Sequence, residues 1–213
     1  MNEIITLGID QLMHSKFKTH NECDDELYYY LNKPSGCLWG STYTPDDKYA
    51  SDWERWADGE DFAHYTYGIV YELKRDARVY TIDSLDDFVE LLKMYPFPDP
   101  MYRDVNVNIR PLARLYLDFC KIMQDYDAIH LTHNGNAETH LIWNYPEIDV
   151  ADKKYGISNL NSWDVESWLI LNFDSIDLDS VKLYEKKLTK EMAPEEMLRY
   201  VVNQLKHLVE SEE

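Results

Sequence analysis

The sequence predicts an α+β fold in a single domain that spans residues 1–213. Short apolar runs bounded by turn residues, typical of strands, are interspersed with segments whose apolar residues recur at helical spacing. With 213 residues, of which 45% are hydrophobic, the chain can bury one large core. No internal repeat, low-complexity segment or linker divides it, which favours one domain over two small ones.

The first half of the chain contains candidate strands and helices with clear ends. Ser51 or Asp52 can cap one helix and Ser84 another, and the prolines from Pro96 to Pro100 end the second of them. The polar turn 74–76 predicts a hairpin between the strands that flank it. The expected strands are 4–7, 38–42, 67–73 and 78–82, and the expected helices are 24–31, 52–57 and 84–95.

The second half of the chain predicts the remaining elements. A helix is expected at 111–126, and strands at 128–132 and 139–143 flank the residues Asn134-Gly135-Asn136, a strong hairpin signal. Residues 145–162 are polar and predict a loop, which leads toward a strand at 168–171. A last helix, at about 194–210, has an apolar stripe that is expected to dock on the sheet.

Several features predict a cytoplasmic protein. No apolar run is long enough to span a membrane. The first residues, 1–3, lack the basic and apolar regions of a signal peptide. The three cysteines, Cys23, Cys37 and Cys120, are an odd number without a Cys-x-x-Cys pair, which fits reduced thiols better than a disulfide framework.

Charge and histidine spacing argue against two classes of function. A net charge of −19 would repel bare nucleic-acid phosphate, and no patch of Lys and Arg offsets it. Two interpretations of this charge stay open: it keeps the protein soluble, or the acidic surface imitates nucleic acid and blocks a basic partner. The acidic residues are spread along the chain, which favours the first. No metal site is predicted, because His130 and His133 would project to opposite faces of a strand.

Two carboxylates stand just before the apolar strand at 168–171. Asp164 and Glu166 are two residues apart, so in extended backbone they would project to the same side where that strand begins. A carboxylate at the edge of a sheet can meet a substrate. Acidic residues in this position are also commonly solvated turn residues, so both interpretations remain open.

A second segment, residues 33–43, combines glycines with hydroxyl and aromatic side chains. Gly40 allows a close approach of the backbone to a neighbour or a ligand. Ser41 and Thr42 supply short hydrogen-bond donors, while Trp39 and Tyr43 supply flat apolar faces. The alternative is an ordinary strand that leaves a turn.

Taken in this order, the two segments resemble the ADP-ribosyltransferase superfamily, of the bacterial or phage type. Residues 38–42, Leu-Trp-Gly-Ser-Thr, resemble its aromatic-Ser-Thr strand, and residues 164–166, Asp-Val-Glu, resemble its acidic signature before a late strand. The resemblance implies a mixed or antiparallel split sheet with flanking helices. The family usually has an Arg or His on its first strand, where this chain has neither. Thr6 takes that place, or His14 reaches in from the following turn.

The resemblance implies cleavage of the nicotinamide–ribose bond of NAD⁺, bound as a substrate. Glu166 would stabilise the positive charge that develops on the ribose, and Asp164 would accept a proton from the attacking group. Thr6, Ser41 and Thr42 would position the ribose or Glu166. The strands at 38–42 and 168–171 are therefore expected to be neighbours in the sheet or facing walls of one cleft. The nicotinamide would pack on Trp39 or Tyr43.

A chain this acidic predicts a protein acceptor with a basic surface, met partly through the loop 145–162, rather than a nucleic acid. Two other functions stay open. The same site could hydrolyse NAD⁺ without an acceptor. Alternatively, the protein is no enzyme and blocks a basic partner, as a nucleic-acid mimic or an inhibitor of a defence system does.

Overall fold

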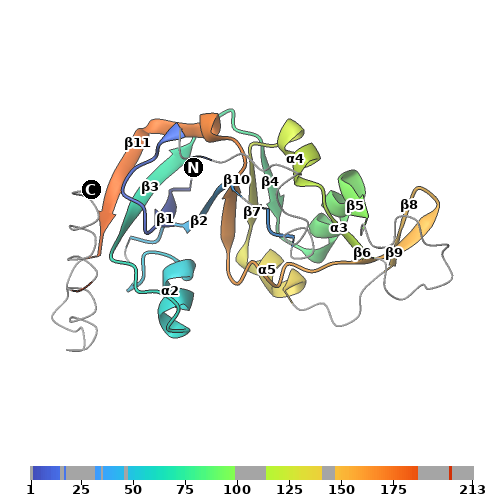
Figure 1. The fold of residues 1–213 in the computed structure, drawn as a ribbon, viewed down its shortest axis with the longest axis horizontal. Coiled ribbons are helices and arrows are strands. Elements are labelled where there is room, and N and C mark those ends of the chain that lie inside the picture. The colour runs from blue at the N-terminus through green and yellow to red at the C-terminus, as the bar shows by residue number, and fades with distance from the viewer. Residues whose placement is uncertain are drawn as a thin grey trace.

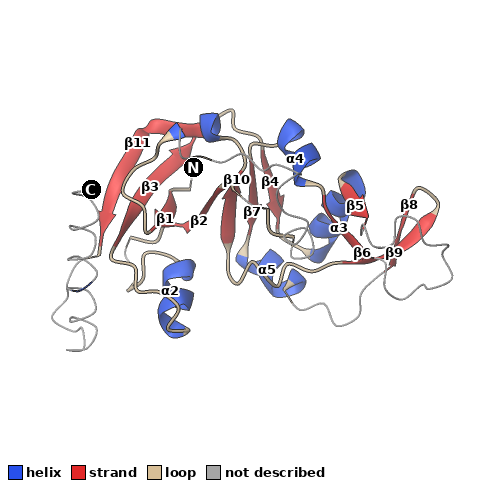
Figure 2. Cartoon of the chain, in the orientation of Figure 1, coloured by secondary structure: helices blue, strands red, loops and turns tan. Residues whose placement is uncertain are grey.

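The computed structural model describes residues 2–14, 17, 32–34, 36–45, 48–98, 114–140, 147–186 and 202. These residues form a seven-stranded sheet, a four-stranded sheet and α-helices at four places, so the α+β class is confirmed (Figures 1 and 2). The expected helices at 24–31 and about 194–210 lie outside the described residues, apart from Val202, which is helical.

The seven-stranded sheet has the order β11-β3-β1-β2-β10-β7-β4. All neighbours are antiparallel except β4 and β7, so the sheet is mixed. Its strands are β1 (Ile4–Leu7), β2 (Leu38–Thr42), β3 (Tyr67–Leu73), β4 (Val79–Ile82), β7 (Ala128–Leu131), β10 (Ser167–Ile170) and β11 (Ile176–Glu185). The expected neighbouring placement of the strands at 38–42 and 168–171 is therefore confirmed.

The central strand, β2, changes its partner along its length. On one side, Ser41 and Thr42 pair with β1, whereas on the other side residues 38–40 pair with β10. Beyond the last β1 pair, the side chain of Thr6 continues the contact, because its Oγ1 donates to the carbonyl oxygen of Trp39 at 2.9 Å. Residues of three strands, β1, β2 and β10, thus meet around Gly40.

The four-stranded sheet has the order β5-β6-β9-β8 and extends away from the larger one (Figure 1). Its strands are β5 (Pro96–Pro98), β6 (Arg114–Leu117), β8 (Glu147–Val150) and β9 (Lys153–Ile157). Helix α3 (Leu85–Met94) contacts β4 of the large sheet and β5, β6 and β8 of the small one. Its fully buried residues Phe88, Leu91 and Leu92 belong to a core shared by both sheets.

Two short helices begin where the sequence places their caps. The Ser51 hydroxyl accepts from the backbone N–H of Glu54 at the start of α2 (Asp52–Gly59), and the Ser84 hydroxyl accepts from that of Asp87 at the start of α3. Helix α2 contacts β2. It therefore covers the sheet near the point where β2 changes partner.

Three expectations about the elements are wrong, and each fails because tertiary pairing overrides a local pattern. The strands on either side of residues 74–76 do not form a hairpin, since β3 pairs with β1 and β11 while β4 pairs with β7. The expected helix at 111–126 is helical over α4 (Phe119–Asp125), which Asp118 caps, whereas Arg114–Leu117 form the strand β6. The polar stretch 145–162 is not all loop, because β8 and β9 form a hairpin within it.

The expected hairpin turn at Asn134-Gly135-Asn136 is also wrong, since these residues lie in α5 (His133–Thr139). Thr132 caps this helix by accepting from the N–H of Gly135. A Cβ on Gly135 would lie 2.0 Å from the carbonyl oxygen of Ile82. The glycine therefore allows the helix to approach β4 closely, rather than allowing a turn.

Candidate functional site

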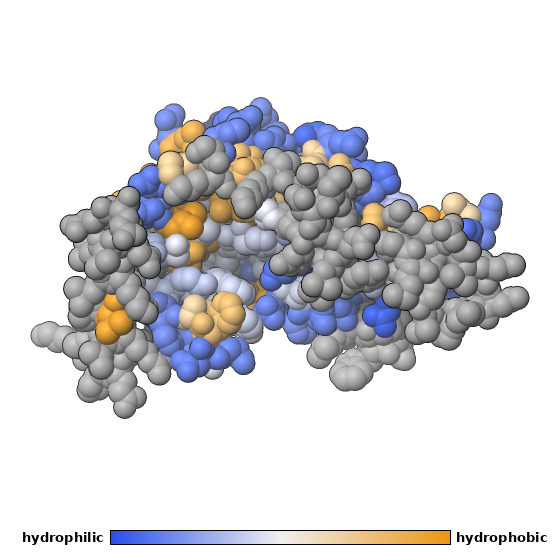
Figure 3. All heavy atoms as spheres, viewed as in Figure 1, coloured by the Kyte–Doolittle hydropathy of each residue, from blue (hydrophilic) through white to orange (hydrophobic). Residues whose placement is uncertain are grey.

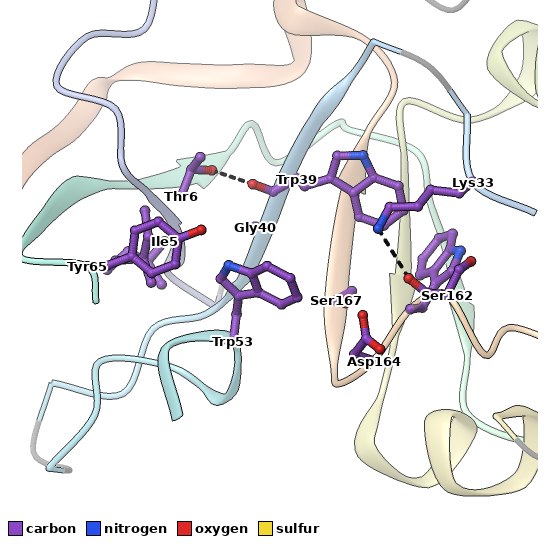
Figure 4. Close-up of a pocket in the computed structure, with 12 residues that line it drawn as sticks. Ile5, Thr6, Lys33, Trp39, Gly40, Trp53, Tyr65, Ser162, Asp164 and Ser167 are labelled. Carbon is purple, nitrogen blue, oxygen red and sulfur yellow. Dashed lines mark hydrogen bonds between the residues drawn. The ribbon is translucent and has the colours of Figure 1, made fainter. Parts of the chain in front are cut away.

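A pocket of about 330 Å³ opens where β1, β2 and β10 meet, with α2 on one side (Figure 4). This volume is at the small end of the range for ligand pockets. Aromatic side chains form much of its wall, and one cation and one carboxylate complete it. The lining residues that matter below are Thr6, Lys33, Trp39, Trp53, Tyr65 and Asp164.

Beside this pocket, the carboxylate of Glu166 is held by four hydrogen bonds. Its Oε2 accepts from the Ser41 hydroxyl at 2.7 Å and from the backbone N–H of Thr42 at 2.9 Å. Its Oε1 accepts from the Thr42 hydroxyl at 2.7 Å and from Nε2 of His130 at 2.8 Å. Glu166 is only 3% exposed. Its carboxylate is thus fixed in position at the start of β10.

These contacts keep Glu166 ionised. Burial alone would raise its pKa, but hydrogen bonds from His130, Thr42 and Ser41 outweigh burial and hold the pKa below its usual value. Within the described residues, the ion-pair partner of Glu166 is the imidazole of His130 and not a Lys or Arg. The negative charge is therefore stabilised mostly by oriented dipoles.

The histidine in this group comes from β7, the strand on the far side of β10 from β2. His130 lies opposite Trp168 in the strand register, and the two rings stack with centroids 3.9 Å apart and planes 12° from parallel. The indole N–H of Trp168 donates to the Thr42 hydroxyl oxygen at 3.0 Å, which leaves the Thr42 proton for Glu166. Sequence reasoning missed the role of His130, because nothing local to 128–133 indicates a partner 36 residues away.

Asp164 and Glu166 have different surroundings. Strand β10 begins only at Ser167, so the alternation of a strand does not extend back over residues 164–166. Asp164 is half-buried and lines the pocket, as Ser167 does. Glu166 lies between them in sequence and turns into its own hydrogen-bond network. It is not among the residues that line the pocket.

The other candidate residues fall into two groups. Thr6 and Trp39 line the pocket, and Ser41 and Thr42 hold Glu166. Tyr43 instead packs against Tyr184, with ring centroids 6.1 Å apart, and is not a lining residue. Of the two replacements considered for the first-strand Arg or His, Thr6 is the one at the pocket.

His14 lies away from the pocket lining. Its ring meets the edge of Phe173 at 5.1 Å, and its Nε2 is 3.9 Å from a carboxylate oxygen of Asp174. The side chain is 74% exposed. His14 therefore belongs to the surface next to β11.

One wall of the pocket is anchored by Asn32, a fully buried residue with a positive φ of 48°. Its amide nitrogen donates to Ser158 Oγ and to the carbonyl oxygen of Asn159, and its amide oxygen accepts from the N–H of Leu117. Its carbonyl oxygen accepts from the indole N–H of Trp163.

This anchor places the next residue, Lys33, in the pocket wall. The Lys33 ammonium lies 5.3 Å from the ring centroid of Trp39 and donates to the carbonyl oxygen of Ser162 at 3.2 Å (Figure 4). A cation is thereby fixed over an aromatic face, within a pocket that also holds Asp164.

Comparisons with known proteins add no relative. No protein-family model, curated protein or solved structure matches the chain. Within the part of the chain that the structure describes, no group of three or more His, Cys, Asp or Glu side chains could hold a metal ion. In the same residues, no helix is long and apolar enough to cross a membrane.

Proposed function

We propose that the protein cleaves NAD⁺ at its nicotinamide–ribose bond and transfers ADP-ribose to a protein acceptor. The observation that carries this proposal is the hydrogen bond between Ser41 and Glu166. It joins two segments 125 residues apart, each of which independently resembles an ADP-ribosyltransferase motif. A pocket with aromatic walls lies beside the two segments, and such walls suit a planar ring.

The pocket offers complementary contacts to the reacting end of NAD⁺. The nicotinamide ring carries a positive charge, which the indole face of Trp53 can attract, and Trp39 offers further apolar surface for the ring to pack on. The ammonium of Lys33, in the same pocket, can attract the negative diphosphate. The small volume fits the nicotinamide and ribose, so the rest of the dinucleotide extends outside.

The ionised Glu166 supplies the electrostatic part of the mechanism. When the bond breaks, nicotinamide leaves with the bonding electrons, and positive charge develops on the ribose carbon. A carboxylate that is already fixed by four donors need not reorganise as this charge appears. The low pKa keeps it charged at neutral pH.

Asp164 is the candidate base for the second half of the reaction. The attacking group of the acceptor forms the new bond to the ribose carbon and gives up its proton, which Asp164 can take. Its place in the pocket wall, two residues before the buried Glu166, gives the two acids separate tasks. One carboxylate contributes charge from a fixed position, and the other exchanges a proton at the surface of the pocket.

The proposed acceptor is a protein with a basic surface. On the face shown in Figure 3, much of the described surface is hydrophilic, and the net charge of −19 would attract a basic partner. A nucleic acid would need a local cationic channel, and Lys153 and Lys154 lie on the β8–β9 hairpin of the small sheet, not in the pocket lining. Lys154 already lies 3.8 Å from a carboxylate oxygen of Glu147.

The decisive experiment is incubation of the purified protein with NAD⁺ labelled on its adenylate part, with and without a cell lysate. We expect labelled macromolecules that resist nuclease and disappear with protease. Asp164→Asn should reduce transfer more than NAD⁺ cleavage, and Glu166→Gln should reduce both. Free ADP-ribose alone would identify a hydrolase, label sensitive to nuclease would refute the protein acceptor, and no NAD⁺ cleavage would refute the whole proposal.

A further inference from the structure

The imidazole of His130 is held as rigidly as the carboxylate it contacts. His130 lies on β7, where its backbone pairs with β10 and its ring stacks on Trp168. Its side chain is 13% exposed. An ionised carboxylate can only accept, so the 2.8 Å contact from Nε2 to Glu166 Oε1 requires the proton on Nε2. The ring therefore has one fixed orientation and one defined donor.

We propose that His130 is a positioning residue, which holds the Glu166 carboxylate in place and in its charged form during NAD⁺ cleavage. This inference rests on the proposed function. His130 is not among the residues that line the pocket, so it acts through Glu166 and not on the substrate. Of the donors to Glu166 among the described residues, Ser41 and Thr42 lie on β2, whereas His130 comes from β7.

The geometry separates the task of His130 from that of the other donors. Ser41 and the N–H of Thr42 hold Oε2 from the β2 side, whereas His130 holds Oε1 from the β7 side. Without His130, Oε1 keeps only the Thr42 hydroxyl, which can rotate. The carboxylate would then lose its fixed orientation and part of the stabilisation of its charge.

Glu166 is the ionised side chain that His130 contacts. The residues facing it from neighbouring strands are Thr81 on β4 and Trp168 on β10, and Thr42 on β2 shares its carboxylate. None of these three is charged. In these positions, no other charged group stands between His130 and Glu166.

The test compares His130→Leu, which removes the donor, with His130→Gln, whose amide can still donate. For His130→Leu we expect kcat for NAD⁺ cleavage to fall about 10-fold or more, the effect of one charge-assisted hydrogen bond, with KM changed by less than about 2-fold. The acid limb of the kcat profile should move to higher pH. His130→Gln should recover most of the rate.

A matched control is His133→Leu, three residues away on α5. His133 also contacts a carboxylate, Asp52, at 2.9 Å, but its side chain is 75% exposed and lies outside the pocket lining. Its loss should leave kcat and the pH profile unchanged. Thermal unfolding of each variant shows whether the protein still folds. If His130→Leu does not fold, the test is made with His130→Gln.

A second measurement needs no activity. Carbon NMR of labelled glutamate carboxyls, with the Glu166 signal assigned from its absence in Glu166→Gln, follows the titration of Glu166 directly. Its titration should move to higher pH in His130→Leu and not in His133→Leu. If the wild type does not cleave NAD⁺ but this shift occurs, the proposed function fails and the control of Glu166 by His130 stands. An unchanged titration, or an unchanged kcat in an active protein, overturns the inference.

Discussion

Among the residues that the structure describes, two glutamates are almost completely buried, and they are stabilised in opposite ways. Glu54, on α2, is 1% exposed, and Glu166, before β10, is 3% exposed. Glu54 forms an ion pair with Lys186 at 3.1 Å and accepts from the N–H of Ala50 at 2.6 Å. Glu166 is surrounded by two hydroxyls, an amide and an imidazole.

The difference teaches that burial alone does not identify a functional carboxylate. The charge of Glu54 is cancelled by an ammonium, so little negative potential remains around it. Three of the four donors to Glu166 are neutral hydroxyl and amide groups, which stabilise its charge without cancelling it, so its field extends into the neighbouring pocket. Glu54 ties α2 to the segment after β11, and Glu166 is the one that we propose acts on a developing cation.

The largest effect should come from Glu166→Gln, which removes this charge. We expect NAD⁺ cleavage to drop by about 10²-fold or more, as when one electrostatic stabiliser of a transition state is lost. The new amide N–H₂ must also meet groups that donate in the wild type, so stability should fall by about 1–2 kcal/mol. Turnover by the purified variant and its urea unfolding measure the two effects. Wild-type turnover would remove Glu166 from the mechanism.

Glu54→Gln should show the reverse pattern. Lys186, with 14% of its side chain exposed, would lose its carboxylate partner. We expect a loss of about 2 kcal/mol in stability, less than for a fully buried pair because some hydration remains. NAD⁺ cleavage per folded molecule should stay within about 2-fold of wild type. If cleavage fell as far as in Glu166→Gln, the contrast between the two glutamates would be wrong.

A smaller effect is expected at a glycine near each glutamate. A Cβ on Gly40, which lines the pocket, would lie 2.6 Å from Ile4 Cγ2 and 3.0 Å from the Ile5 carbonyl oxygen. Gly40→Ala should therefore push β1 from β2 and cost about 1–2 kcal/mol. Gly59 ends α2 with nothing within 4 Å of such a Cβ, so Gly59→Ala should be neutral or stabilise by up to about 1 kcal/mol. Chemical denaturation measures the stability of both variants. Equal changes in stability would contradict the close approach of β1 to β2 at Gly40.

The smallest effect concerns acid. Because folding lowers the pKa of Glu166 from its usual value of 4.5, ionisation of this group favours the folded state above that pH. This contribution is lost as the pH falls through the lowered pKa. The stability difference between the wild type and Glu166→Gln should therefore shrink below pH 4.5, in unfolding curves recorded at several pH values. A difference that grows on acidification would contradict an ionised Glu166.

The sequence predicts strand positions well where a strand is short, apolar and bounded by turn residues. Strands β1, β2 and β3 have the expected ends, and the pairing of β2 with β10 followed from the chemistry of Ser41 and Glu166. It could not predict β6, because the apolar residues around Arg114–Leu117 also fit helical spacing. Which pattern prevails depends on β5 and β9, which flank β6 in the folded sheet.

The candidate site was predictable only in its local parts. Ser41, Thr42 and Glu166 belong to short motifs, and the sequence indicates them as a group. The partnership of His130 with Glu166 depends on the order of strands in the sheet, which no local pattern encodes. For the same reason, a strand pattern at Tyr43 gave no sign that its ring would pack on Tyr184 instead of the pocket.

The hydrogen bonds of Asn32 join the pocket wall to the small sheet, so that the two should open together. Its side chain joins Leu117 of β6 to Ser158 just beyond β9, while its backbone is bound to Trp163 and leads directly into Lys33. Asparagine suits this place, because it tolerates a positive φ and can both donate and accept. A local opening that released Lys33 would have to break bonds in the small sheet as well. The backbone that carries Lys33 therefore keeps its place in the pocket wall for as long as these bonds to the small sheet hold.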